Sequence, residues 1–264
     1  MMTEDERYLF DLTGYLVIKD VLTVEEVERC NAAIDHHFDQ AKEIDRSLSG
    51  NSKTLSGTSR RIDLGGMLAW EHPWCEPFRE FLIHPRVKPY LDGILGEGYR
   101  LDHGPGMIAM DRGAEGGTLH GGGIERPNFS EAYFFKDGRI YTGLTVVEYM
   151  LADEGPGDGG LAVIPGSHKA NLPCPQSMKL WEKYQEHVLE VNAEAGDAII
   201  FSETLTHGTL PWTAEHQRRA VLYKFSPGFQ AYSAGAHQIT YPDYIEDMTP
   251  EQREVMEAPH IRRR

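Results

Sequence analysis

Apolar residues change their spacing along the chain, and this change predicts helices in the first part and strands in the second. A short apolar run in 10–22 predicts a strand or extended segment. A helix is expected to begin at Thr23, where a glutamate three residues later completes a capping-box pattern ahead of an apolar stripe. Two more helices are expected, one after Trp74 and one that Gly96 ends, whereas the polar segment 39–60 predicts a mobile loop.

From about residue 99, short apolar runs rich in β-branched residues alternate with turns rich in glycine and proline. The runs are 106–110, 143–151, 161–165, 187–191, 198–201 and 220–225. Many short strands between turn signals predict an all-β sandwich or barrel. We therefore expect one domain over 1–264, with helices in about 1–98, a β core in about 99–230 and a C-terminal extension in 231–264.

Composition and charge narrow the choice of partners. A chain of 264 residues that is 40% hydrophobic can bury one sizeable core. A net charge of −15 argues against a nucleic-acid polymer or an anionic membrane as partner, but allows a small anionic ligand held by a few arginines. The N-terminus does not resemble a signal peptide, and no apolar stretch approaches the length of a membrane span. The three scattered cysteines predict no disulfide framework. We therefore expect a cytoplasmic protein.

Two histidines and an arginine suggest a metal site. His120 follows one expected strand and His207 follows another, 87 positions later (207 − 120), so only the folded core could bring them together. Arg218 comes 11 positions after His207 (218 − 207). Ferrous iron in oxygenases takes two imidazoles and a carboxylate on one face and leaves the other face open. A dicarboxylate co-substrate would need a fixed cation such as Arg218, and Thr209 could add a hydrogen bond.

Spacing alone leaves open that these histidines are ordinary polar residues, because no local metal motif surrounds them. Three segments give further information. They are DLTGYLVIKDVLTVEEVERC near the N-terminus, DGGLAVIPGSHK at 158–169, and GDAIIFSETLTHG followed by Arg218. Together, and over about residues 10–228, these segments resemble the phytanoyl-CoA dioxygenase family.

The resemblance implies a mainly β fold with flanking helices, namely a double-stranded β-helix (jelly roll, cupin-like). It also implies Fe(II), 2-oxoglutarate and O2, with His120 and His207 as iron ligands and Arg218 as the anchor of the co-substrate. The Pro-Gly-Ser-His turn of the second segment contains His168, which we expect to be a structural loop residue rather than a ligand.

One position departs from the family pattern. The family has His-x-Asp at its first ligand, whereas Gly122 stands where the aspartate is expected, and glycine has no donor atom. In similar halogenases a chloride or bromide ion fills this vacancy, and a ferryl–chloride intermediate chlorinates an unactivated C–H bond. This is the first hypothesis for the reaction.

Two alternatives remain. A hydroxylase could use a substitute carboxylate from Asp111, Glu115 or Glu125, or water in its place. Alternatively, the barrel could bind a small molecule without catalysis, and the glycines would then form only a flexible turn.

The substrate is the least determined part. An aromatic segment over 124–141 would overhang the iron in this fold, and Phe129, Tyr133 and Phe134 could stack on a ring-bearing substrate while Arg126 holds an anionic group. Packing within the segment explains the aromatic residues equally well. A freestanding small molecule such as a nucleotide monophosphate is the leading hypothesis, and the sequence does not define the oligomeric state.

Overall fold

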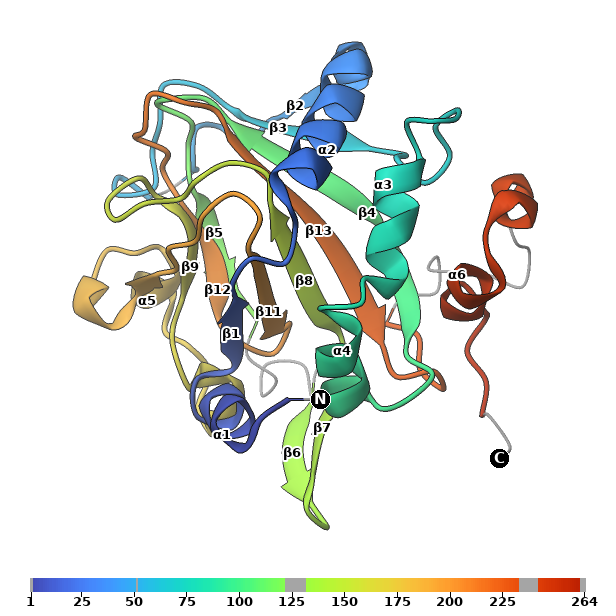
Figure 1. Ribbon diagram of the computed structural model, residues 1–264. Coiled ribbons are helices and arrows are strands. Elements are labelled where there is room, and N and C mark those ends of the chain that lie inside the picture. Colours follow the sequence, from blue (N-terminus) through green and yellow to red (C-terminus); the bar gives the residue numbers. More distant parts are fainter. Residues whose placement is uncertain (1, 51, 122–131, 233–241, 262–264) are drawn as a thin grey trace.

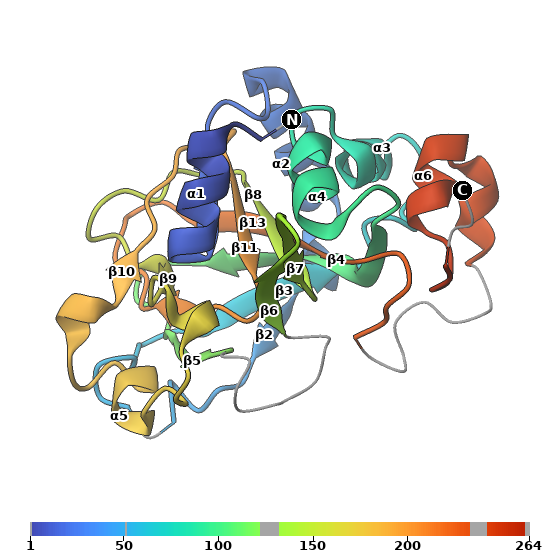
Figure 2. The ribbon, with the colours of Figure 1, turned by 90° about the horizontal axis from the view of Figure 1, so that it is seen from below.

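The computed structural model describes residues 2–50, 52–121, 132–232 and 242–261. The chain forms three layers: a layer of helices, a large antiparallel sheet and a smaller antiparallel sheet (Figures 1 and 2). The fold is thus mainly β with flanking helices, as the sequence predicted. Within the described part of the chain, no helix has the length and apolar character that a membrane span requires.

The large sheet has seven strands. In spatial order they are β1 (Tyr15–Ile18), β11 (Ala198–Ser202), β8 (Thr145–Met150), β13 (Arg218–Ser226), β4 (Arg100–Met110), β3 (Arg61–Gly65) and β2 (Lys42–Ile44). The small sheet has four strands, in the order β10 (Leu189–Glu190), β9 (Gly160–Val163), β12 (His207–Leu210) and β5 (Gly117–His120). A separate hairpin pairs β6 (Tyr133–Lys136) with β7 (Arg139–Thr142).

Six α-helices accompany the sheets in the described residues. They are α1 (Glu4–Thr13), α2 (Val24–His36), α3 (Glu76–Glu80), α4 (Lys88–Leu95), α5 (Gln176–Lys179) and α6 (Pro250–Val255). The capping box predicted at Thr23 is confirmed, because its side chain accepts from the amide of Glu26 while the Glu26 side chain accepts from the amide of Thr23. Gly96 ends α4 with a φ of +91°, a backbone conformation that favours glycine.

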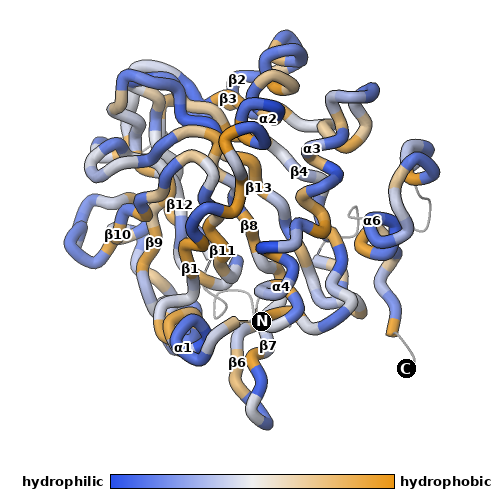
Figure 3. The backbone as a smooth tube through the Cα atoms, in the orientation of Figure 1, coloured by the Kyte–Doolittle hydropathy of each residue, from blue (hydrophilic) through white to orange (hydrophobic). Residues whose placement is uncertain are grey.

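Two apolar cores lie on the two faces of the large sheet. One face packs against the helices, where Tyr149 and Tyr223 meet Phe81. The opposite face packs against the small sheet, where Phe201 belongs to the same cluster as Val163. Every residue of β8 and β11 is buried because both faces of these strands are covered, and Figure 3 shows apolar residues concentrated along the central strands.

The N-terminal part contains more strand than the sequence predicted. The predicted strand within 10–22 is present only as β1, because α1 already extends to Thr13. The segment expected to be a loop over 39–60 begins with β2, and β3 follows it, so three strands from the first 98 residues extend the large sheet. The large sheet therefore takes its outer strands from the region assigned to helices, and one of them, β3, carries Arg61, which lines the cavity at the candidate site.

Candidate metal centre

The structure brings the two predicted histidines together. His120 ends β5 and His207 begins β12, and the two residues are directly opposite partners in the antiparallel ladder. Their ring centroids lie 4.3 Å apart. The convergence follows from strand pairing, because directly opposed residues of an antiparallel pair place their side chains on the same face.

Each imidazole is oriented by a backbone carbonyl two residues before it. The Nδ1 atom of His120 lies 3.3 Å from the carbonyl oxygen of Thr118, and Nδ1 of His207 lies 2.7 Å from that of Leu205. A carbonyl oxygen can only accept, so Nδ1 carries the hydrogen in both rings and donates it. The lone pair of each Nε2 is therefore free, which is the arrangement that orients histidine ligands in metal sites.

A carboxylate that sequence reasoning missed completes the group. Oε1 of Glu203 lies 4.0 Å from Nε2 of His120 and 3.9 Å from Nε2 of His207, and the Glu203 side chain is only 8% exposed. Its other oxygen lies 3.1 Å from the ammonium of Lys224. The potential ligand atoms of His120, Glu203 and His207 all lie within 4.8 Å of one another.

The electrostatics of the group keep the ligand atoms available. Repulsion from His207, followed by burial, lowers the pKa of His120 to about 4, so its ring is neutral near pH 7. Burial would raise the pKa of Glu203, but the charges of His207, Lys224 and His120 together outweigh it and hold that pKa below its ordinary value. Two imidazoles and one carboxylate are the donor set that suits Fe(II) in non-haem oxygenases, so the residues present fit such an ion.

A second histidine–glutamate group lies at the end of α2, and its surroundings differ. His36, His37 and Glu71 are also close enough to share an ion, but Glu71 is 65% exposed and the rings of both histidines stack on tryptophans. This group contributes nothing to the wall of the cavity described next.

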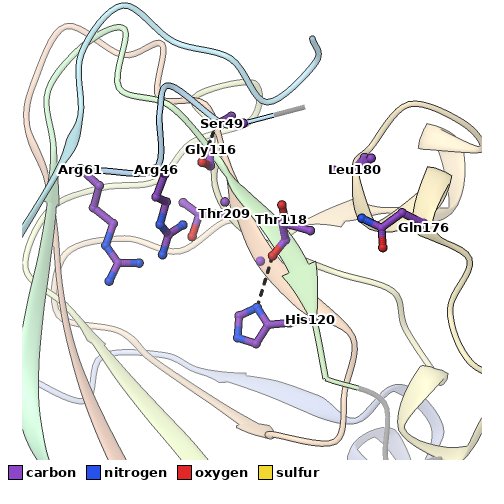
Figure 4. Close-up of a pocket in the computed structure, with 12 residues that line it drawn as sticks. Arg46, Ser49, Arg61, Gly116, Thr118, His120, Gln176, Leu180 and Thr209 are labelled. Carbon is purple, nitrogen blue, oxygen red and sulfur yellow. Dashed lines mark hydrogen bonds between the residues drawn. The ribbon is translucent and has the colours of Figure 1, made fainter. Parts of the chain in front are cut away.

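A cavity of about 530 Å³ opens beside His120. Its polar wall is formed by Arg46, Ser49, Arg61, Thr118, Gln176 and Thr209, together with the ring of His120. Figure 4 shows the guanidinium groups of Arg46 and Arg61 turned toward the same space as that ring. Thr209 lines this cavity, whereas Arg46 comes from a segment that the sequence assigned to a loop.

Arg218 is placed differently from the expectation. Its guanidinium is buried between two glutamates, with Nη2 2.6 Å from Glu148 and Nε 2.5 Å from Glu154, and it does not belong to the cavity wall. Burial raises the pKa of Glu154 to about 7, even though Arg218 acts to lower it. The structure therefore pairs Arg218 with protein carboxylates rather than presenting it to the cavity.

The two predicted substrate residues that the structure describes, Tyr133 and Phe134, do not line the cavity. The Tyr133 hydroxyl donates to Asp11 at 2.7 Å, and Phe134 stacks on Tyr141, so both residues are engaged in or beside the β6–β7 hairpin. Gly122, Arg126 and Phe129 lie outside the described residues.

The alternative carboxylates are also accounted for. Asp111 accepts from Gln217 on the surface, Glu115 is buried outside the metal group, and Glu125 lies outside the described residues. His168 is buried against Tyr133 and bonded to the carbonyl of Asp11, which agrees with the structural role expected for it.

The sequence matches a known protein family over most of its length. The family model described as phytanoyl-CoA dioxygenase (PhyH) matches residues 10–220, which is most of the chain. The chain belongs to the phytanoyl-CoA dioxygenase family. A search of curated proteins finds no match to the sequence.

Solved structures with a similar fold include HygX and SnoN. HygX from Streptomyces hygroscopicus, in a structure with nickel, 2-oxoglutarate and hygromycin B bound, is 21% identical with a TM-score of 0.68, covering 91% of this chain and 96% of its own. The epimerase SnoN from nogalamycin biosynthesis is 14% identical with a TM-score of 0.60, covering 84% of this chain and 81% of its own. At these identities the likeness concerns the fold.

Proposed function

We propose that this member of the phytanoyl-CoA dioxygenase family is an Fe(II)/2-oxoglutarate-dependent oxygenase that acts on a small molecule, with iron held by His120, Glu203 and His207. One observation carries the proposal: a buried carboxylate faces the free Nε2 atoms of two histidines that strand pairing brings together. Bound ferrous iron would supply the activation of O2, chemistry that no amino-acid side chain provides. We further propose that the two sheets form the double-stranded β-helix (jelly roll) that the resemblance implies.

The residues of the chain hold and orient the group. The carbonyl oxygens behind each ring fix the histidine tautomers, and the Lys224 ammonium holds one oxygen of Glu203 so that the other faces the histidines. His120 also faces the cavity, which gives a ligand access to the ion. Related structures support the choice of co-substrate, since HygX was solved with nickel and 2-oxoglutarate and SnoN with Fe3+ and alpha ketoglutarate.

The resemblance assigns the distal carboxylate of 2-oxoglutarate to Arg218, with Thr209 assisting. Under this hypothesis Arg218 would have to share its guanidinium with the co-substrate, and Glu154 is the partner better suited to release it because its pKa of about 7 allows protonation near neutrality. Removal of Arg218 should then weaken the binding of 2-oxoglutarate.

Halogenation is the second candidate function, and the glycine at position 122 favours it. A halide could replace the missing aspartate as a ligand, and the substrate carbon would then receive chlorine instead of hydroxyl. Glu203 argues for oxygenation instead, because a protein carboxylate at the ion would occupy the place that a halide needs. The two functions therefore differ in whether Glu203 or halide completes the coordination.

The test is anaerobic addition of Fe(II) and 2-oxoglutarate, followed by absorption spectroscopy. We expect a visible metal-to-ligand charge-transfer band that is lost in His207→Ala and retained in His187→Ala, whose side chain is 65% exposed on the surface. Absence of the band from the parent protein would instead support a barrel that binds small molecules without catalysis.

Chloride separates the two reactions. For an oxygenase, succinate formation and iron affinity should not respond to chloride or bromide, and Glu203→Gln should reduce both. A dependence on halide that persists in Glu203→Gln and is abolished in Gly122→Asp would establish the halogenase instead.

A further inference from the structure

The cavity beside the metal centre has a charge opposite to that of the whole protein. The chain carries 41 acidic and 26 basic side chains, yet the twelve described residues that line the cavity include Arg46 and Arg61 and no carboxylate. Such a wall is suited to an anion, because fixed positive charge in a partly enclosed space raises the local concentration of negative ligands.

The two arginines differ in how their charge is compensated. Arg61 donates from Nε and Nη2 to the two carboxylate oxygens of Asp63, at 2.5 Å each, so its charge is neutralised within β3. Arg46 makes no hydrogen bond or ion pair with another described residue, although it is half-buried. Burial and the neighbouring charge of Arg61 lower the pKa of Arg46, because both disfavour its charged form.

The local backbone is shaped to admit this unpaired guanidinium. A Cβ atom at Gly117 would lie only 1.9 Å from Nη1 of Arg46, so a larger residue in this part of β5 would displace the arginine. Thr118 and Thr209 line the same cavity and add hydroxyl donors near the cations. Asp63 and Glu115 act on Arg46 only through longer-range charge, so its half-buried guanidinium keeps its hydrogen-bond donors available to an anion in the cavity.

We propose that Arg46, supported by Arg61, forms an anion subsite that binds a carboxylate or phosphate group of a ligand occupying the same cavity as His120. The proposal rests on the proposed function only for which ligand carries the anionic group. Two sources could supply the anion: the distal carboxylate of 2-oxoglutarate or an acidic group on the substrate.

The experiment uses the full chain loaded with Ni(II), which prevents turnover, and isothermal titration calorimetry. In the first arm, 2-oxoglutarate is compared with 2-oxovalerate, which has the same keto acid but no distal carboxylate. In the second arm, inorganic phosphate is titrated in the presence of saturating 2-oxoglutarate. The variants are Arg46→Gln, Arg46→Lys and the control Arg112→Gln, whose parent side chain is exposed and paired with Glu215.

A charge-assisted contact predicts a loss of at least about tenfold in affinity when Arg46 becomes glutamine, with partial recovery for lysine and no change for Arg112→Gln. If the loss affects 2-oxoglutarate but not 2-oxovalerate, the anion is the co-substrate carboxylate. If it affects phosphate alone, the subsite serves an acidic substrate. Gly117→Ala, which crowds the guanidinium, should reproduce the loss in the same arm.

The proposal is overturned if neither arm responds to Arg46→Gln while the variant keeps the thermal stability of the parent. Failure of the proposed function gives a different result. The parent protein would then bind neither Ni(II) nor 2-oxoglutarate, and phosphate titrated into the metal-free protein would still report on Arg46.

Discussion

Replacing Arg218 with methionine tests the buried charge cluster that the structure assigns to this residue. The substitution keeps a long side chain but removes the cation that contacts Glu148 at 2.6 Å and Glu154 at 2.5 Å. All three side chains are at most 2% exposed, so water cannot replace the lost partner. The variant must either bury an unpaired carboxylate or protonate it.

The two routes predict similar costs. Breaking a buried pair by removing one partner costs about 3–5 kcal/mol. Protonating a glutamate with an ordinary pKa of about 4.3 at pH 7.0 costs about 3.7 kcal/mol, at about 1.36 kcal/mol for each pH unit. Glu154 adds little to this cost because its pKa is already raised to about 7 by burial. We therefore expect a loss of about 4 kcal/mol, or roughly 8–16 °C in Tm for a protein of this size.

Urea unfolding followed by circular dichroism at pH 7.0 and pH 5.5 measures this loss. At pH 5.5 the same protonation costs only about 1.6 kcal/mol, so the deficit of Arg218→Met should shrink by about 2 kcal/mol. The control is Arg29→Met, which removes an ion pair with Glu80 at 3.4 Å between side chains that are 47% and 49% exposed and should cost less than about 1 kcal/mol. A deficit for Arg218→Met as small as that of the control, or one that does not change with pH, would refute the reasoning.

Three further outcomes follow from the structure. Glu203→Gln should weaken Mn(II) affinity by at least about 100-fold in calorimetry, because loss of an outer-shell partner alone already costs about 10–100-fold; unchanged affinity would remove Glu203 from the ligand set. Burial raises the pKa of Glu154 from 4.5 to about 7, so the folded state holds more protons between these values and stability should fall as pH rises through them. Glu154→Gln should flatten that fall, which is at most about 3.4 kcal/mol in urea titrations, whereas a pH profile identical to the parent's would contradict the assignment. Thr23→Ala should lower stability by about 1 kcal/mol through loss of the α2 cap, and an unchanged thermal melt would show that the capping box contributes nothing.

Local patterns in the sequence predicted the regular elements well. The cap at Thr23, the end of α4 at Gly96 and the run that became β11 were found because each depends on neighbouring residues. The strands β2 and β3 were missed because they are short and partly exposed, and because β3 pairs with the distant β4 while β2, at the edge of the sheet, pairs only with β3.

In the candidate site, too, some residues could be predicted from the sequence and others could not. Convergence of His120 and His207 could be predicted because both follow expected strands. Glu203 was missed because the family pattern places the carboxylate two residues after His120, whereas Glu203 lies four residues before His207, in the turn that leads into β12. A carboxylate that close to a candidate ligand was the available signal. Nothing in the sequence around Arg46 indicated a cavity, because its position depends on the folding of a distant segment over Gly117.

The position of β5 has a consequence for how the chain reaches its folded state. β5 is the last strand of the small sheet and is held in it by β12, with an irregular register between His207 and Thr209. A slip of one residue would turn the His120 imidazole to the opposite face. An ion bound by both imidazoles would stabilise the correct register of β5 on β12, because only that register places both rings on one face. Amide exchange in β5 should therefore slow on metal addition. Metal supply during synthesis would then influence how many molecules mature correctly, before any turnover takes place.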